Sequence, residues 1–333
     1  MTNFRTEIFL NGAPFEIIPG EGIMLIGSCF AENIGQKFSE ARFSPCVNPF
    51  GVLFNPFSVV DTLNSILEKR FFAPSDLIFD GQLWHSYFHH GSFSGNNMDK
   101  MLAHINHTVE VSHNELLNAD HLFITLGTAW VYQEKESGHV VANCHKFPDS
   151  MFNRFRLTSN EVCGRLKSVL SDLKSVNPKI NIVLTVSPVR HWKDTAYGNQ
   201  LSKAVLLLAI DEICQEFDFI SYFPAYELVL DDLRDYRFYA DDMVHPNTLA
   251  INYVWSKLQD FCFGTKARMF IKGTTEIENG LRHKPFHPNT TQHKIFLEGL
   301  LKKIDSIENL YPRISLLNDR ACIEKRIREI AID

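Results

Sequence analysis

Three residues in this chain are of the types that cooperate in nucleophilic catalysis: Ser28, Asp242 and His245. A serine hydroxyl is a poor nucleophile until a neighbouring base takes its proton, and histidine suits that role because its ordinary pKa is about 6.5. The imidazole in turn needs a carboxylate that fixes its tautomer and stabilises the imidazolium. Asp242 precedes His245 by only three residues, so one loop can present both groups. Together the three residues predict a serine esterase.

The sequence around Ser28 predicts the elements that must present its hydroxyl. Ile23–Ile26 is a short apolar run, typical of a buried strand, and a helix-like stretch over Glu32–Phe38 follows the Gly27-Ser28 pair. A strand that turns into a helix at this point lifts the serine out of the C-terminal edge of the sheet, where open α/β folds place their ligands. We expect the loop with the acid and the histidine to reach the same edge.

Each of these assignments has a simpler alternative. Ser28 can cap the helix that follows it, since serine is a favoured N-cap residue. Asp242 can cap the helix that begins near Asn247, or Asp241 can be the carboxylate that pairs with the histidine. His245 can be an ordinary loop residue. We favour catalysis because the serine turn and the acid–histidine spacing occur together in one chain.

Short apolar runs alternate with amphipathic stretches along the chain. This alternation predicts an α/β fold with a doubly wound, mainly parallel sheet and helices on both faces. Thr158-Ser159-Asn160-Glu161 is a capping box that opens one of the helices, which Asn177-Pro178 closes. The expected strands are Ile23–Ile26, His121–Thr125, Ile180–Val186 and Phe219–Tyr222, and the expected helices run over about 158–176, 199–217 and 247–261.

Three segments depart from this alternation. Residues 41–95 are rich in Pro, aromatic residues and His, and predict an irregular insertion with one short helix near Ser58–Lys69. Trp130–Gln133 and His139–Val141 predict a hairpin. Beyond Gly264 the composition becomes helical and charged, with charged faces typical of solvated helices. We therefore expect a catalytic domain over 1–263 and a helical C-terminal extension over 264–333 packed on the core.

Composition excludes several classes of function. The chain has 333 residues, 45% of them hydrophobic and 22% charged, as in a globular protein. The net charge of −6 gives no general attraction to nucleic acid or anionic membranes. No run approaches the roughly 20 apolar residues that span a bilayer, and the N-terminal residues lack the pattern of an export signal. The seven cysteines include no CxxC pair and indicate a reducing compartment, so we expect a cytoplasmic protein.

The turn that carries the serine has a recognisable sequence. Gly27-Ser28-Cys29-Phe30-Ala31 resembles the name motif of the GSCFA family, which is placed within the SGNH/GDSL-like hydrolase superfamily. The resemblance runs from about residue 20 to at least residue 300. It implies an SGNH-type fold in which Ser28 is the nucleophile, His245 the general base and Asp242 its orienting partner. Further matching stretches are Asn48-Pro49-Phe50-Gly51, Leu126-Gly127-Thr128-Ala129-Trp130, Asn143-Cys144-His145-Lys146, Ser187-Pro188-Val189-Arg190-His191 and Asp242-Met243-Val244-His245.

The resemblance also implies an oxyanion hole, made from the backbone N–H of the serine, a glycine N–H and an asparagine side chain. Ser28 and Gly51 are the candidates for the two backbone donors. The chain departs from the superfamily at the third, because Ala129 occupies the place of the asparagine. Losing one oxyanion donor costs about 100- to 1000-fold in rate. Residues that could replace it, or contact the substrate, are Asn48, Asn55, Thr128 and His145.

Other reactive side chains have weaker claims. Arg190 follows a predicted strand, where it can grip a carboxylate or phosphate of the substrate or pair with a surface acid. Cys29 and the Cys144-His145 pair suggest thiol chemistry, but we favour a buried, inert thiol for Cys29. The histidines at 85, 89 and 90 lie in a stretch that does not predict a helix, which argues against a zinc site. We expect no metal and no cofactor.

The predicted reaction is hydrolysis of a small acyl ester through an acyl-enzyme. The resemblance implies an acetylated carbohydrate or a related metabolite as the substrate. An acyltransferase would use the same triad with a sugar hydroxyl in place of water. A catalytically silent module that binds a ligand on the same fold is the third possibility, and Ala129 is the residue that favours it.

Overall fold

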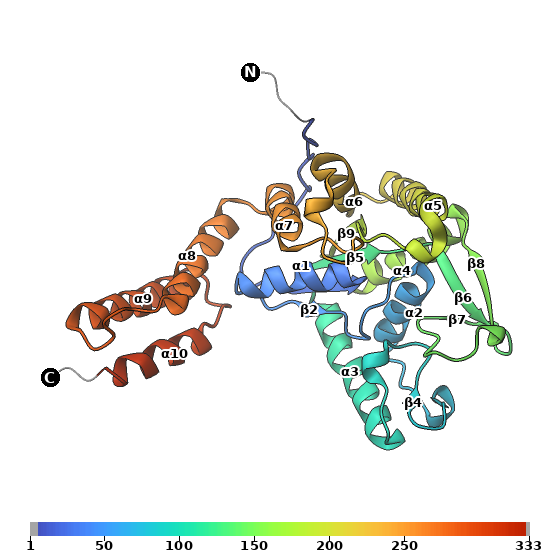
Figure 1. Cartoon of the computed structure of the whole chain (residues 1–333), viewed down its shortest axis with the longest axis horizontal. Coiled ribbons are helices and arrows are strands. Elements are labelled where there is room, and N and C mark those ends of the chain that lie inside the picture. Colours follow the sequence, from blue (N-terminus) through green and yellow to red (C-terminus); the bar gives the residue numbers. More distant parts are fainter. Residues whose placement is uncertain (1–5, 331–333) are drawn as a thin grey trace. The chain divides into compact units, whose positions relative to one another are not determined.

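The computed structural model describes residues 6–330 (Figure 1). The strands are β1 Ile23–Gly27, β2 Cys46–Val47, β3 Ile78–Phe79, β4 Trp84–His85, β5 His121–Leu126, β6 Trp130–Glu134, β7 Val140–Val141, β8 Phe152–Arg156, β9 Asn181–Val186 and β10 Ile220–Tyr222. The helices are α1 Cys29–Glu40, α2 Pro56–Leu67, α3 Met98–Asn118, α4 Ser159–Val176, α5 Thr195–Glu216, α6 Ala225–Glu227, α7 Thr248–Cys262, α8 Thr265–Arg282, α9 Thr291–Leu310 and α10 Leu317–Arg328.

The chain folds into two compact units. The first contains the described residues up to Pro14, together with Gly22–Gln36 and Pro45–Phe261. The second contains Phe15–Glu21, Lys37–Ser44 and the described residues from Cys262 onward. All residues predicted to take part in catalysis belong to the first unit.

The first unit is built on a parallel sheet. Within residues 6–330, five strands form this sheet in the order β10-β9-β5-β1-β2. The order reverses between β1 and β5, because β2 lies on one side of β1 whereas β5, β9 and β10 lie on the other. Open α/β sheets bind ligands at such a switch point, beyond the carboxyl ends of the strands. Ser28 directly follows β1 at this position.

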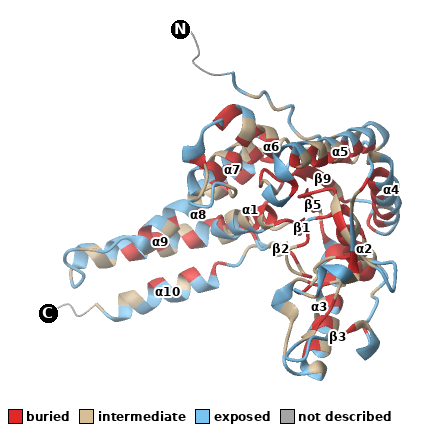
Figure 2. Cartoon of the chain, turned by 45° about the vertical axis from the view of Figure 1, so that its right-hand side comes forward, coloured by how far each residue is buried: buried red, intermediate tan, exposed pale blue. Residues whose placement is uncertain are grey.

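The sheet is buried on both faces, as the predicted doubly wound fold requires, and Figure 2 shows the buried residues gathered on β1, β5 and β9 and on the helices around them. Side chains alternate between the two faces of a strand. One face joins a continuous apolar core with α2, α3, α4 and α5, and each Leu or Ile fully buried there contributes about 1.5–3 kcal/mol. Members of this core include Met24, Ile26, Leu63, Ile105, Leu122, Ile124, Leu166, Leu184, Val186 and Ile210.

The predicted elements are confirmed, with additions. The four expected strands form the centre and one edge of the sheet, and Thr158 and Glu161 make the expected capping box at α4. The irregular insertion contains α2 but also β2, which pairs with β1 through Met24–Cys46 and Leu25–Val47. The expected hairpin of β6 and β7 is antiparallel and gains β8 as a third strand.

The second unit is helical, as predicted for the C-terminal extension. Arg42 fixes α8 and α10 within this unit, since its guanidinium pairs with Glu278 and with Asp319, the latter at 2.8 Å. Helices α8 and α9 pack closely at Gly280, where an added Cβ would lie 2.6 Å from Leu300 Cδ1. No helix within residues 6–330 is both long enough and apolar enough to span a bilayer.

Candidate active site

The turn that carries Ser28 depends on the glycine before it. Gly27 has a φ of +141°, and a Cβ at this position would lie 2.1 Å from the carbonyl oxygen of Thr125. The backbone N–H of Ser28 donates to the same oxygen at 3.1 Å, and Leu53 N–H donates to the carbonyl of Gly27 at 2.9 Å. These hydrogen bonds hold the turn between β5 and the segment that follows β2.

The Ser28 hydroxyl serves a local role in this structure. The side chain is buried, and its Oγ accepts a hydrogen bond from the backbone N–H of Phe30 at 3.2 Å. This contact corresponds to the predicted alternative, in which Ser28 satisfies an N–H in the first turn of α1. Within the described part of the chain no hydrogen bond joins Ser28 to His245. The nucleophile–base contact of the predicted triad is therefore not made in this conformation.

Asp242 and His245 are paired. Asp242 Oδ2 lies 2.6 Å from His245 Nδ1, and Asp242 Oδ1 accepts from the backbone N–H groups of Val244 and His245, both at 2.9 Å. The two backbone hydrogen bonds, then the imidazole, lower the pKa of Asp242 to about 2. The ionised carboxylate favours a proton on Nδ1 and leaves Nε2 as the acceptor nitrogen. Both side chains are about half exposed.

Arg190 holds the loop that carries this pair. Its guanidinium donates to the carbonyl oxygen of Met243 and lies 4.7 Å from the ring centroid of Tyr239 and 5.0 Å from that of Trp192. Met243 has a φ of +57°, which is unfavourable for a side chain of this size. Arg190 therefore contacts backbone and aromatic rings, and no ion pair to a surface acid is present among the described residues.

His191 lies half-buried at the edge of the sheet. Burial, together with the charges of Lys203 and His245, lowers its pKa to about 4. Its Nε2 would lie 3.3 Å from a Cβ added at Gly127, which directly follows β5. His191 is therefore close to the end of the strand beside β1. Its neighbour in sequence, Arg190, donates a hydrogen bond to the acid–histidine loop at Met243.

Lys203 lies beneath this edge and was not singled out by the sequence. Its side chain is fully buried, and its Nζ donates to the carbonyl oxygens of Gly127 at 2.6 Å and Ser187 at 2.7 Å. Burial lowers the pKa of the ammonium group to about 7. The two acceptors are the residues that follow β5 and β9, so Lys203 fastens the ends of two neighbouring strands.

A cleft of about 550 Å³ opens beside these strand ends. Phe54, Thr128 and His191 line it on the side of the sheet, and Phe54 also accepts hydrogen bonds from Gly127 and Thr128 through its carbonyl oxygen. Trp130 and Arg154 also line the cleft, and the Arg154 guanidinium lies 4.5 Å from a Trp130 ring centroid and pairs with Asp194. Additional lining residues are Asn55, Tyr132, Lys146, Trp192 and Lys193.

The hydrogen bonds do not support the predicted oxyanion hole. Ser28 N–H already donates to Thr125, and Gly51 N–H donates to the carbonyl of Asn48 at 2.7 Å. Ala129 is fully buried, and its methyl group belongs to the apolar core. A backbone N–H that already has a short acceptor is not available to a developing oxyanion without a rearrangement.

The four candidates for an additional donor differ in their availability. Thr128 Oγ1 lies 2.9 Å from Ser202 Oγ and also accepts from Trp130 N–H. His145 Nε2 donates to the carbonyl of Ser86 at 2.8 Å, and burial is the main cause of its lowered pKa.

Asn55 caps α2 with its side chain, and its amide nitrogen donates to Ser58 Oγ at 2.8 Å. Asn48 differs from these three residues. Its buried Nδ2 has no hydrogen-bond partner among the described residues.

The insertion contains a second Ser–His–Asp arrangement that the sequence did not suggest. His85 Nδ1 lies 2.7 Å from Ser94 Oγ, and His85 Nε2 lies 2.9 Å from Asp80 Oδ2. Backbone N–H groups and His85 lower the pKa of Asp80 to about 2. Neither Ser94 nor His85 lines the cleft, which is also true of Ser28, Asp242 and His245, and both ring nitrogens of the buried His85 are already hydrogen-bonded. The arrangement resembles the hydrogen bonding of a satisfied core histidine.

The thiol alternatives gain no support from the structure. Burial raises the pKa of Cys29 and raises that of Cys144 to about 11, which disfavours the reactive thiolate at neutral pH. His89 is buried and stacks on Phe50 at 4.3 Å between ring centroids. Within residues 6–330 no group of three or more His, Cys, Asp and Glu side chains has the arrangement of a metal site.

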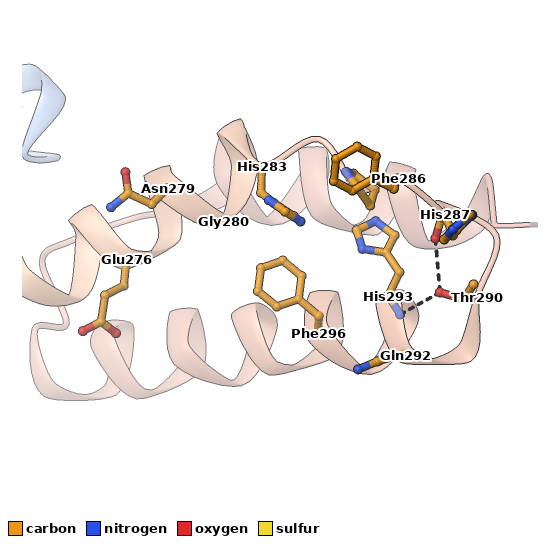
Figure 3. Close-up of a pocket in the computed structure, with 11 residues that line it drawn as sticks. Glu276, Asn279, Gly280, His283, Phe286, His287, Thr290, Gln292, His293 and Phe296 are labelled. Atoms are coloured by element: carbon orange, nitrogen blue, oxygen red, sulfur yellow. Dashed lines mark hydrogen bonds between the residues drawn. The ribbon is translucent and has the colours of Figure 1, made fainter.

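Another hollow, of about 660 Å³, lies between α8 and α9 in the second unit. Figure 3 shows His283, His293 and Phe296 extending into it. Thr290 lies at its end, where its Oγ1 accepts from His293 N–H and donates to the carbonyl of His287, both at 3.2 Å. No residue predicted for the site lines this hollow. The cleft of about 550 Å³ is lined by two of the predicted substrate or oxyanion contacts, Asn55 and Thr128, but not by Ser28, Asp242 or His245. We take it as the candidate binding cleft.

Two solved structures show a distant similarity to this chain. A protein described provisionally as a platelet activating factor from Streptococcus pneumonia is 11% identical, with a TM-score of 0.38 over 74% of this chain and 84% of that chain. An acetyl xylan esterase from the rumen bacterium Butyrivibrio proteoclasticus is 12% identical, with a TM-score of 0.37 over 74% of this chain and 64% of that chain. None of the curated proteins matches the chain in sequence.

Sequence-family models give the stronger result. The model of the GSCFA domain protein, C-terminal domain, matches residues 275–329, within the helical second unit. The model of the GSCFA family matches residues 22–258, which include the whole parallel sheet, the Ser28 turn and the loop with Asp242 and His245. Because this match covers well over half of the sequence and all of the candidate active site, the chain belongs to the GSCFA family.

Proposed function

We propose that this protein is a serine-dependent esterase that hydrolyses a small acyl ester through Ser28, His245 and Asp242. The observation that carries the proposal is the Asp242–His245 pair, with 2.6 Å between Oδ2 and Nδ1. An ionised carboxylate on Nδ1 prepares Nε2 of the imidazole to accept a proton. Arg190 and His191 support a common location for this pair and Ser28, since Arg190 donates to Met243 O and His191 lies beside Gly127 at the end of β5.

The reaction proceeds in two steps. Ser28 Oγ leaves its contact with Phe30 N–H and attacks the ester carbonyl carbon, while His245 Nε2 takes the hydroxyl proton. The imidazolium then gives this proton to the leaving alcohol, and the acyl group remains on Ser28. A water molecule, deprotonated by His245, then attacks the acyl carbon. The bond between this carbon and Ser28 Oγ breaks, the imidazolium returns the proton to Ser28 Oγ, and the acid is released. Asp242 stays ionised throughout and stabilises the imidazolium.

The cleft supports an ester of a carbohydrate-like alcohol, such as an acetylated sugar. Phe54, Trp130 and Trp192 provide apolar surfaces against which the C–H face of a sugar ring can pack. Lys146 and Lys193 provide polar groups at the same cleft for its hydroxyls. Binding sites of this kind combine apolar walls with a few polar groups that fix orientation.

A fluorophosphonate probe followed by peptide mapping tests the nucleophile. We expect the adduct on Ser28 in the wild-type protein and no adduct in the Ser28→Ala variant. Ser94→Ala is the matched control, because Ser94 belongs to the other Ser–His–Asp arrangement. We expect this variant to be labelled like wild type. Equal labelling of wild type and Ser28→Ala would overturn the proposal.

One observation favours a second candidate, a ligand-binding module without catalysis. Ser28 Oγ is engaged with Phe30, and the N–H groups of Ser28 and Gly51 already have acceptors. Hydrolysis of p-nitrophenyl acetate distinguishes the two functions. The esterase predicts that His245→Ala lowers the rate by at least about 100-fold, as expected for loss of a general base. Equal rates in wild type and variant would favour the binding module.

A further inference from the structure

Asn48 has an unusual position at the end of β2. Its backbone N–H still belongs to the parallel ladder and donates to Leu25 O at 2.8 Å. Its φ of +44° then turns the chain away from the sheet, and its own carbonyl accepts the turn hydrogen bond from Gly51. The side chain continues the ladder in place of the backbone, because Asn48 Oδ1 accepts from Gly27 N–H at 2.8 Å. The amide therefore lies beside the residue that precedes Ser28.

The hydrogen bond from Gly27 also fixes the orientation of the amide. A backbone N–H requires an acceptor, so the atom facing Gly27 is Oδ1 and the other atom is the NH₂ group. Asn48 Nδ2 is shielded from solvent and has no partner among the described residues. Buried amide donors without an acceptor are rare in folded proteins because they cost folding free energy. Because this donor lies beside the candidate nucleophile, an oxygen acceptor that forms during the reaction can satisfy it.

We infer that Asn48 Nδ2 donates a hydrogen bond to the oxyanion formed at Ser28, and so replaces the asparagine whose place Ala129 occupies. The inference rests on the proposed esterase function. As Ser28 Oγ bonds to the carbonyl carbon, the electron pair of the C=O π bond moves onto the oxygen. Asn48 supplies one N–H to this negative oxygen and does not itself gain or lose a proton. It thus acts as a catalytic residue through stabilisation of the transition state.

The other donors near the turn are already committed. Ser28 N–H and Gly51 N–H have backbone acceptors, and Asn55 Nδ2 donates to Ser58 Oγ. Ala129 contributes only a methyl group to the core. Among these donors, the amide of Asn48 can bind an oxyanion without first breaking a hydrogen bond.

Asn48→Asp separates the proposed role from the structural one. Aspartate keeps an oxygen that accepts from Gly27 N–H, but it removes the NH₂ donor. We expect kcat for p-nitrophenyl acetate to fall about 100- to 1000-fold, with KM within about threefold of wild type. Asn106→Asp is the control, since Asn106 also accepts from and donates to one backbone residue, Phe72, at 2.8 and 3.0 Å. We expect its kcat to remain within about twofold of wild type.

A second measurement covers the case in which Asn48→Asp folds poorly. The ratio of kcat/KM for p-nitrophenyl acetate to that for its thionoester does not depend on the fraction of folded protein. Sulfur accepts hydrogen bonds more weakly than oxygen, so loss of an oxyanion donor should lower this ratio at least about tenfold in Asn48→Asp. An unchanged ratio, or wild-type kcat in the variant, would overturn the role of Asn48 alone. Absence of Ser28-dependent hydrolysis in the wild-type protein would overturn the esterase function as well.

Discussion

The guanidinium of Arg190 donates a hydrogen bond to the carbonyl oxygen of Met243, which lies inside the loop formed by Asp242 and His245. The same guanidinium lies over the rings of Trp192 and Tyr239. Arg190 follows β9, so this contact attaches the loop with Asp242 and His245 to the end of an interior strand of the sheet. In the proposed esterase, Arg190 is therefore a positioning residue for His245.

Arg190→Ala should misplace His245 and lower kcat/KM for p-nitrophenyl acetate by about 10- to 100-fold, since displacements of about 1 Å cost this much in catalysis. Arg190→Lys retains a cation above the rings and should recover part of the loss. Arg237→Ala is the control, because Arg237 lies in the neighbouring segment with an exposed side chain. Wild-type rates in both Arg190 variants would show that the loop does not need this anchor.

Asp242→Asn tests the orienting carboxylate. The amide oxygen can still accept from Val244 N–H and His245 N–H, so the loop should keep its shape. The imidazole loses the charged partner of Nδ1 and no longer has its tautomer fixed. We expect kcat to fall about 1000- to 10,000-fold with little change in KM.

Asp241→Asn is the matched comparison for this variant. Asp241 is the adjacent exposed acid and makes no hydrogen bond to His245 among the described contacts. We expect its kcat to resemble that of wild type. A larger loss in Asp241→Asn than in Asp242→Asn would assign the orienting role to Asp241. Both measurements use steady-state hydrolysis of p-nitrophenyl acetate.

The sequence predicts those parts of the fold and site that depend on local patterns. The central strands are apolar runs of five or six residues, long enough for their burial to be evident. The spacing of Asp242 and His245 places both groups in one turn of chain, and the structure pairs them. β2 has only two residues and no detectable periodicity, so its place beside β1 depends on pairing that a sequence does not reveal.

The parts that sequence reasoning missed depend on contacts between distant segments. Lys203 looks like an ordinary surface lysine in an amphipathic helix, but the ends of β5 and β9 provide two carbonyl acceptors that make its burial possible. The predicted donor Gly51 was identified from a motif. Whether its N–H is free depends on the turn at Asn48, which the motif does not specify. Which acceptor a backbone N–H binds is decided by the folded structure, so a motif alone does not show whether the N–H is available.

Gly27→Ala tests whether the serine turn needs glycine. A Cβ there would lie 2.1 Å from Thr125 O at a φ of +141°, so the backbone must shift. We expect the free energy of unfolding to fall by at least about 3 kcal/mol, because steric conflict adds to the strain of the dihedral angle. Gly164→Ala makes the same change within α4, where nothing lies within 4 Å. It should stabilise the protein by about 0.5–1 kcal/mol. Urea unfolding of both variants measures whether each substitution lowers or raises the free energy of unfolding.

His191 predicts how stability depends on pH. In the folded protein burial lowers its pKa to about 4, whereas an unfolded chain has a histidine pKa of about 6.5. Between these values the unfolded state binds more protons than the folded state. Stability therefore rises with pH across this window, and the contribution of His191 is complete above pH 6.5 and lost as pH falls toward 4.

The difference in pKa corresponds to about 3 kcal/mol of unfolding free energy. His191→Gln removes the titrating group and leaves the backbone N–H that donates to Asn199 Oδ1. We expect the wild-type protein to lose more stability than this variant between pH 7 and pH 4, measured by urea unfolding at several pH values. Parallel curves for the two proteins would mean that His191 accepts a proton as readily when folded as when unfolded, and its burial against Phe54 and Gly127 would then not control its charge.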